Sequence, residues 1–254
     1  MTSYTIANIN LTKEYLRECY SLAKSYNELV NWHDLDIIFE IALMNMDYFP
    51  GIKIQGQQNP QIYIDRWVKG YSYAVNNLPS KRTANPKGSC TDPAIKAIVQ
   101  GTQGLSDEEA KLGETIHNLF MSAENIQGNL LEEYIATKVR PYGLIWCAGN
   151  VLRAIDFCNT EGTFLLQVKN KSNTENSSSS NIRVGTTIIK WYRLGTQTRK
   201  GLKYPAYKWD NLISLINQFK TEGQSLPQCI MSESDYQAFL KSKSTANRTL
   251  ITSL

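Results

Sequence analysis

In the first 77 residues of the chain, apolar positions recur every three or four residues. Such series cover residues 11–30, 33–48 and 60–77, and Pro50 and Gly51 end the second one. This spacing places the apolar side chains on one face of a helix. We therefore predict three amphipathic helices in the N-terminal part of the chain.

The helical pattern continues after a polar interruption. Residues 78–92 are basic and rich in turn formers, which predicts a surface loop. A short helix is expected over residues 93–104. A longer one begins at Ser106, where Glu109 completes a capping-box pattern. Another helix is expected from about residue 126 to residue 138.

Beyond Gly143 the pattern changes. The runs YGLIWCAG, RAIDF, TFLLQVK and TTIIKWY are short, rich in β-branched and aromatic residues, and separated by turn formers, which indicates strands. The later stretches WDNLISLINQF and SESDYQAFLKS are expected to be helices, and QCIM between them fits a short strand. The chain is therefore predicted to have an α/β (α+β) fold with a helical N-terminal half.

The composition excludes several classes of protein. The chain has 254 residues, 42% hydrophobic and 20% charged, which is ordinary for a globular protein with a buried core. It has no run of 18 apolar residues and no signal-peptide layout. We therefore expect a cytoplasmic protein that is not inserted in or bound to a membrane. Its five cysteines form no CxxC pair, and His33 and His117 share no motif. A disulfide framework, a zinc cluster and a Ser/His/Asp triad are therefore not expected.

The segment that carries chemistry is RAIDFCNTEGTFLLQVKNK. Asp156 interrupts one apolar strand, the NTEG turn follows, and Gln167 and Lys169 lie on the next strand. Side chains alternate between the two faces of a strand, so Gln167 and Lys169 point the same way. If the two strands pair around the turn, Asp156 lies beside them. This brings a carboxylate, an amide oxygen and an ammonium group to one place.

These groups suit a hydrolytic site with a magnesium ion. Mg²⁺ prefers oxygen ligands, so the expected ligands are Asp156, Gln167 and the backbone carbonyl of Val168. A lysine beside the metal can orient or deprotonate a water and offset negative charge. The spacing alone is also common at an ordinary exposed strand edge, and that alternative stays open on these residues.

The order of helix, strand with Asp156, turn and strand ending in x-Lys169 resembles the PD-(D/E)xK nuclease core of type II restriction endonucleases. Residues 128–132, GNLLE, match the G-x-x-L-E pattern of that family's preceding helix. The resemblance implies a restriction-endonuclease-like core with a central mixed sheet flanked by helices. It also implies that the helix carboxylate Glu132 and the residues Asp156, Gln167 and Lys169 are catalytic. The sequence departs from the pattern in having Gln167 for the usual Glu or Asp.

A second stretch, residues 169–193, resembles the segment after the active site in SinI-like restriction endonucleases, above all in its NSSSS-x-IR and KW-[YF]-R blocks. The resemblance implies a bacterial, Mg²⁺-dependent enzyme that hydrolyses double-stranded DNA at a short palindromic site, GGWCC in the SinI type, and leaves 5′-phosphates. It further implies a homodimer and a cognate DNA methyltransferase as functional companion. The core would occupy residues 116–254. The resemblance does not extend to residues 1–115, which are expected to form a helical subdomain; whether it grips DNA or dimerises stays open.

The charge distribution independently supports a polyanionic partner. The net charge of the whole chain is +4, but residues 167–210 carry nine Lys and Arg against Glu175 and Asp210, a net charge of +7. Residues 170–210 form the expected DNA-recognition segment, although its serine run also fits a flexible linker. Trp191 and Trp209 are expected in the core. The residues expected to contact DNA are Lys171, Asn173, Asn176, Ser178, Ser179, Arg183, Lys190 and Arg193.

Two other functions remain open on the sequence. A nuclease of the same fold could recognise DNA structure in repair or recombination. A DNA-binding protein could have lost its activity, because Gln167 replaces a carboxylate.

Overall fold

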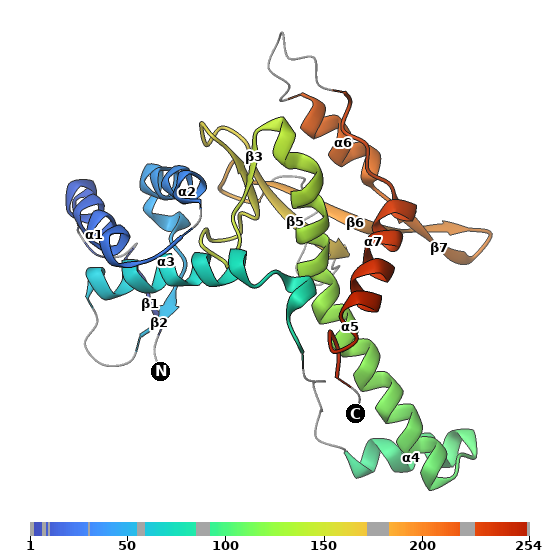
Figure 1. Cartoon of the computed structure of the whole chain (residues 1–254). Helices are drawn as coiled ribbons and strands as arrows, with labels where there is room; N and C mark the ends of the chain where they lie inside the picture. Colours follow the sequence, from blue (N-terminus) through green and yellow to red (C-terminus); the bar gives the residue numbers. More distant parts are fainter. Residues whose placement is uncertain are drawn as a thin grey trace. The chain divides into compact units, whose positions relative to one another are not determined.

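The computed structural model describes residues 3–6, 9, 11–29, 31–54, 59–84, 92–171, 183–218 and 227–252. Its contacts divide the chain into two compact units (Figure 1). Unit 1 consists of residues 1–77 and 134–233, and unit 2 of residues 78–133 and 234–254. Both this boundary, between residues 133 and 134, and the predicted division at residue 115 fall inside one long helix, and the predicted division stays a prediction.

The three N-terminal helices of unit 1 form as predicted. They are α1 (Lys13–Tyr26), α2 (Trp32–Met44) and α3 (Pro60–Asn76). The side chains of Thr12 and Asn59 cap the first turns of α1 and α3. The short strands β1 (Ser3–Tyr4) and β2 (Ile52–Lys53) pair antiparallel. Unit 1 also contains two 3₁₀ turns, η1 (Met46–Tyr48) and η3 (Arg140–Tyr142).

A five-stranded mixed sheet forms the centre of unit 1, as the predicted fold class requires. Its order is β3-β4-β5-β6-β7; only β5 and β6 run parallel, and the other neighbours are antiparallel. The strands are β3 (Leu144–Trp146), β4 (Phe157–Asn159), β5 (Leu165–Lys171), β6 (Ile189–Arg199) and β7 (Leu202–Tyr207).

The strand prediction was incomplete at the C-terminal end. β7 was not predicted, because its sequence LKYPAY is polar and lies on the exposed edge of the sheet. The predicted strand over residues 228–231 is absent from the described chain, where this stretch belongs to no helix or ladder.

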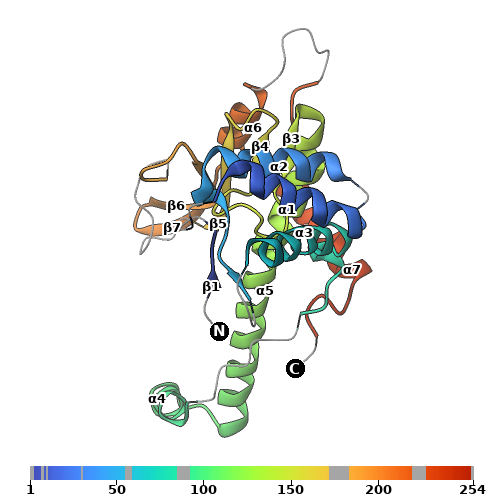
Figure 2. The same cartoon turned by 90° about the vertical axis from the view of Figure 1, so that its left-hand side faces the viewer.

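Helices cover both faces of the sheet (Figures 1 and 2). On one face, Ile145, Cys158 and Leu165 join the core formed with α1, α2 and α3. On the other face, Trp191 packs on Trp209 of α6 (Trp209–Asn217) with ring centroids 5.3 Å apart, which confirms the expected core positions of both tryptophans.

One glycine shows how closely the first face packs. Gly149 has a φ of +79°, and a Cβ there would lie 2.8 Å from both the Ala74 Cβ and the Gly70 carbonyl oxygen of α3.

Unit 2 is built from helices. They are α4 (Pro93–Gln103), most of α5 (Asp107–Val139), α7 (Glu233–Ala246, from Ser234 on) and the 3₁₀ turn η2 (Pro79–Lys81). The capping box at the start of α5 is confirmed, since Ser106 and Glu109 bond to each other's backbone N–H groups. The two helices predicted around residues 106–138 are one continuous helix, because Gln127 and Gly128 do not interrupt it.

Candidate active site

Asp156 lies directly before β4 and is fixed by β5. Its backbone N–H donates to the Leu166 carbonyl at 2.8 Å, and its Oδ2 accepts a hydrogen bond from the Val168 N–H at 2.6 Å. The predicted turn between β4 and β5 closes through the Asn159 side chain, which accepts from the Phe164 N–H at 2.9 Å. The side chain of Asp156 therefore has a defined position beside β5.

The strand register brings the predicted residues together. Phe157 pairs with Leu166, which places Asp156 opposite Gln167, and Gln167 pairs with Lys190 on β6. Lys169 follows Gln167 by two residues, so its side chain is on the same face. The predicted pairing of the two strands around the turn is therefore confirmed. We call Asp156, Gln167, Lys169 and Lys190 the polar row.

The members of the polar row differ in their contact with solvent. Gln167 is 7% exposed, Asp156 and Lys190 are partly buried, and Lys169 is exposed. Burial raises the pKa of Asp156 to about 6, while the Val168 N–H and the positive charge of Lys169 act in the opposite direction. The carboxyl group thus titrates much closer to neutral pH than an ordinary aspartate.

The oxygen atoms of the polar row fit a hard divalent cation. Among the described residues, neither Oδ1 of Asp156 nor the nearly buried amide of Gln167 has a hydrogen-bond partner, so both can accept a ligand. In the same part of the chain, no three His, Cys, Asp or Glu side chains gather as a metal site. A cation here would use one carboxylate together with amide and backbone oxygens, with water filling the other positions.

Comparison with known proteins shows which family the chain resembles. The model of the SinI restriction endonuclease family matches residues 57–231. The chain is 33% identical over 239 residues to the type II restriction enzyme Eco47I of Escherichia coli, covering 89% of this chain and 94% of that enzyme. It is 36% identical over 175 residues to the type II restriction enzyme SinI of Salmonella infantis, covering 67% and 68%.

The chain belongs to the SinI restriction endonuclease family. The family match includes the whole polar row and leaves out α1 and α2. Its members named above are type II restriction enzymes, so this chain is a nuclease of that class. In the described chain, no helix is long and apolar enough to cross a membrane.

Glu132, the carboxylate implied by the GNLLE match, lies on α5 and is partly buried. It belongs to unit 2, whereas the polar row belongs to unit 1. Its catalytic role remains a prediction.

The residues expected to contact DNA fall into three groups. Lys171 is exposed at the end of β5, and Arg183 precedes β6 in a turn where its carbonyl accepts from the Thr186 N–H at 3.0 Å. Lys190 lies in the polar row. Four others lie outside the described residues, namely Asn173, Asn176, Ser178 and Ser179.

Arg193 does not fit the expectation that it contacts DNA. It is 5% exposed and points to the face of the sheet opposite the polar row. Its guanidinium group donates to Asn170 at 3.0 Å and forms two bonds of 2.6 Å to Glu233. The sequence could not show this, because Glu233 lies 40 residues further along the chain. We therefore remove Arg193 from the DNA-contacting set.

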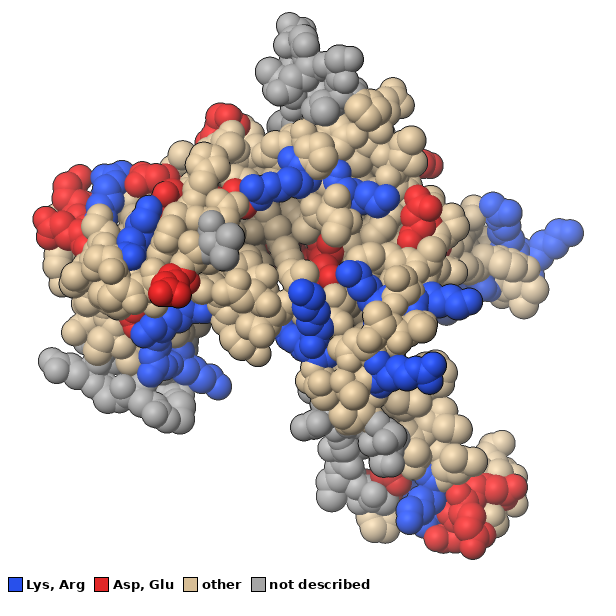
Figure 3. Space-filling model, viewed as in Figure 1, with Lys and Arg blue, Asp and Glu red and all other residues tan. Residues whose placement is uncertain are grey.

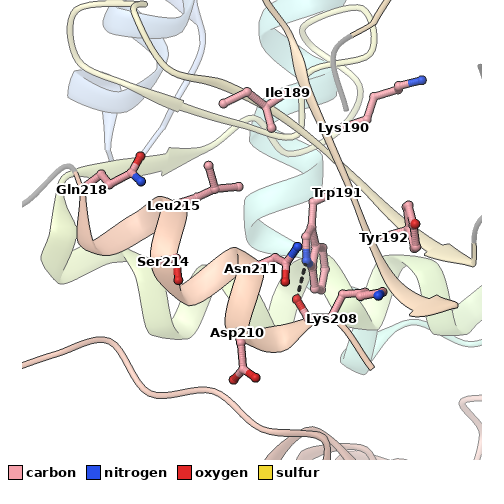
Figure 4. A pocket seen from close by; sticks show the side chains of 10 residues that line it. All are labelled: Ile189, Lys190, Trp191, Tyr192, Lys208, Asp210, Asn211, Ser214, Leu215 and Gln218. Atoms are coloured by element: carbon pink, nitrogen blue, oxygen red, sulfur yellow. Dashed lines mark hydrogen bonds between the residues drawn. The ribbon is translucent and has the colours of Figure 1, made fainter. Parts of the chain in front are cut away.

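A cavity of about 420 Å³ lies between β6 and α6 (Figure 4). Trp191 reaches into this space and donates from Nε1 to the Lys208 carbonyl at 2.9 Å. The side chains of Lys190 and Tyr192 extend away from α6 (Figure 4). Lys190 and Tyr192 are nevertheless among the residues that line the cavity, so it adjoins the polar row at Lys190.

Tyr192 is a neighbour of the site that the sequence did not single out. It pairs with Lys169 across β5 and β6, on the face of the polar row, and is partly exposed. Its spacing of two residues from Lys190 was the available signal, since alternate residues of a strand share a face.

Proposed function

We propose that this chain cleaves double-stranded DNA at a short palindromic site of the GGWCC type, with Mg²⁺ as cofactor and 5′-phosphate ends as product. The observation that carries the proposal is the polar row. It combines a partly buried carboxylate, a nearly buried amide and an exposed lysine on one face of the sheet. The membership in a restriction endonuclease family supports hydrolysis of a phosphodiester rather than another reaction.

In this mechanism Asp156 and Gln167 would hold the cation through side-chain oxygens, together with the backbone carbonyl of Val168. The cation would supply positive charge at the phosphodiester under attack. Lys169 orients the attacking water through its ammonium group and offsets negative charge on the phosphate. The water oxygen bonds to phosphorus and its proton passes to solvent, while the bond from phosphorus to the 3′-oxygen breaks and this oxygen takes up a proton from solvent to become the 3′-hydroxyl. Glu132 is proposed to assist as a further carboxylate.

The DNA is held by positive charge near the polar row. Lys171, Arg183 and Lys190 supply this charge, and the segment of residues 172–182 is proposed to take part through its polar side chains. A palindromic site has two-fold symmetry, so we propose that two copies of the chain act together on it. A DNA methyltransferase of the same specificity would protect the host DNA.

Digestion of a sequenced plasmid tests this function. With Mg²⁺ we expect discrete fragments whose mapped ends share one palindromic sequence and carry 5′-phosphates, and without divalent cations no cleavage. A nuclease that recognises DNA structure would leave an intact plasmid uncut. A protein that has lost its activity would bind the plasmid and never cut it. Either result would refute the proposal.

A further inference from the structure

Strands β6 and β7 continue beyond the other strands of the sheet as a two-stranded ribbon (Figure 1). The pairing of β6 with β5 ends at Leu194, whereas its pairing with β7 continues as far as Arg199 and Leu202. All residues from 196 to 205 are exposed. Because side chains alternate between the two faces of a strand, both faces of this ribbon are open. We call residues 196–205 the β6–β7 ribbon.

A tight turn forms the tip of the β6–β7 ribbon. Lys200 and Gly201 have φ angles of +49° and +78°. A two-residue turn with positive φ at both positions matches the twist of paired strands, so it holds them together at the tip. Asn and Gly are the usual residues at such positions, but this chain has a lysine at the first one. The turn therefore places an ammonium group at the tip of the ribbon.

The charge of the β6–β7 ribbon is entirely positive. Arg199, Lys200 and Lys203 give it a net charge of +3, and residues 176–209 contain no Asp or Glu. Basic side chains gather at this end of unit 1 (Figure 3). In the described part of the chain, none of the three forms an ion pair, although Arg199 donates to the Gln197 side chain at 3.1 Å. Exposed positive charge without a carboxylate partner favours a polyanion.

The edge of the β6–β7 ribbon is unsuited to a partner that adds a strand. Lys203 and Pro205 lie on the edge strand β7, where a lysine and a proline both hinder pairing with a further strand. Protection of this edge does not account for Lys200, which lies in the turn outside the ladder. A partner would therefore contact the side chains of the ribbon and would not extend the sheet.

The dimensions of the β6–β7 ribbon suit a DNA duplex. Paired strands lie about 4.8 Å apart, and the major groove of about 12 Å admits a two-stranded ribbon. One concave space of about 500 Å³ is lined by side chains of both strands and the turn, namely Gln197, Arg199, Lys200, Leu202, Tyr204 and Pro205. Arg, Lys, Gln and Tyr are among the side chains that bond phosphate oxygens. The ribbon can therefore lie in the groove with this space against one phosphate backbone.

We infer that the β6–β7 ribbon binds phosphates of the duplex DNA that flanks the cleavage site. Lys190 of the polar row and Arg199 are both on β6, and nine residues of strand span about 30 Å. DNA rises about 3.4 Å per base pair, so the tip reaches phosphates up to about nine base pairs from the polar row. Such contacts lie outside a short palindromic site and add affinity without reading its sequence. The inference rests on the proposed function, which places DNA at the polar row.

Binding to DNA duplexes of two lengths tests the inference. Both carry the GGWCC-type site at the centre, with about 3 base pairs on each side in one and about 15 in the other, which bracket the expected reach. Fluorescence anisotropy without divalent cations measures binding apart from cleavage. The variant Arg199→Gln/Lys200→Asn/Lys203→Gln should bind the long duplex at least about 10-fold more weakly and lower its slope of log K against log salt by about 2–3. On the short duplex it should match the wild-type protein within about 3-fold.

Two controls keep this test specific. The three substitutions are at exposed positions and Asn suits the turn, so the ribbon variant should fold, which circular dichroism checks. Lys13→Gln/Lys53→Gln/Lys69→Gln removes the same charge from three exposed lysines on α1, β2 and α3, and should keep the wild-type slope. Hydrogen exchange needs no variant: the amides of β7 should exchange more slowly with the long duplex than with the short one.

The outcomes separate this inference from the proposed function. An unchanged slope for the ribbon variant on the long duplex, an equal loss on both duplexes, an equal loss in the control variant, or β7 exchange independent of duplex length would overturn the inference. If the wild-type protein also cuts plasmid DNA into discrete fragments, these results contradict only the inference. Length-dependent binding that the ribbon variant abolishes, in a protein that never cuts DNA, would contradict only the proposed function.

Discussion

The two faces of the central sheet use polar residues in opposite ways. On one face, Asp156, Gln167 and Lys169 stand together, and among the described residues none of their side chains forms an ion pair within hydrogen-bond distance. On the other face, Arg193 is nearly buried and is bonded to Asn170 and Glu233. The first arrangement leaves groups ready for a ligand, and the second fixes the fold.

This difference follows from the alternation of side chains along a strand. Lys190 and Arg193 are three residues apart on β6, so they point to opposite faces. A count of positive charges along the sequence treats them alike. Only the register with β5 shows that Lys190 adjoins Gln167 while Arg193 adjoins Asn170. A positively charged residue in a DNA-binding segment can therefore be assigned as a DNA contact only when the face of the sheet to which its side chain points is known.

The largest effect on stability is expected from Arg193→Met. The variant leaves the Glu233 carboxylate, 16% exposed, without its charged partner, which should cost about 3–5 kcal/mol of unfolding free energy. Urea denaturation followed by tryptophan fluorescence measures the change. Lys169→Met on the opposite face is the matched control and should change stability by about 0.5 kcal/mol or less, because Lys169 is exposed. Equal effects of the two variants would contradict the distinction between the faces.

Asp156→Asn should stabilise the protein at pH 8 in the absence of divalent cations. The native pKa of about 6 lies above the ordinary 3.8, so the folded state holds the proton more tightly and loses stability as the pH rises from about 4 through 6. Removing the charge should recover up to about 3 kcal/mol at pH 8 and nothing below pH 4. Thermal unfolding across this pH range measures it. If Asp156→Asn were less stable than the wild-type protein at pH 8, burial would not disfavour the charged form of the Asp156 carboxyl group.

Gln167→Glu restores the carboxylate that the family pattern usually has. It should tighten Mg²⁺ binding about 10-fold, because affinity for hard cations rises with ligand charge. The Mg²⁺ dependence of the melting temperature reports the change. Asn170→Asp adds the same charge to β5 on the other face and should leave the Mg²⁺ response unaltered. If Asn170→Asp also strengthened the response of the melting temperature to Mg²⁺, a negative charge on either face of β5 would be enough to tighten Mg²⁺ binding, and the polar row would not be the specific site.

The smallest effect is expected from Lys190→Gln. If Lys190 neutralises one DNA phosphate, its loss should lower the slope of log K against log salt by about 1. Filter binding at several salt concentrations measures the slope. Lys13→Gln on α1 is the control and should not change it. An unchanged slope in the Lys190 variant would remove this residue from the DNA-contacting set.

The sequence predicted the local features of the site well. The turn formers of NTEG and the alternation around Asp156, Gln167 and Lys169 fixed the pairing of β4 with β5, because both are set by neighbouring residues. Helix starts were readable for the same reason, as at Ser106. The strand β7 was not readable, since it is an exposed edge without an apolar alternation.

Features that depend on distant residues could not be predicted. The burial of Arg193 depends on Glu233, and the raised pKa of Asp156 depends on how deeply the sheet is covered. That α4 buries none of its residues was likewise hidden, because its apolar spacing is that of a helix with a buried face. The local sequence pattern therefore predicted the helices and strands. Which polar side chains stay available for a ligand depends on their neighbours in the tertiary structure.

The most direct test of the polar row measures cleavage and DNA binding side by side for Asp156→Ala and Lys169→Ala. The account predicts that both variants lose cleavage by at least about 10³-fold with Mg²⁺. Both should still bind the cognate DNA with an affinity within about 10-fold of wild type, since phosphate contacts elsewhere supply most of the binding energy. Cleavage at the wild-type rate by either variant would contradict the claim that these residues form the catalytic centre.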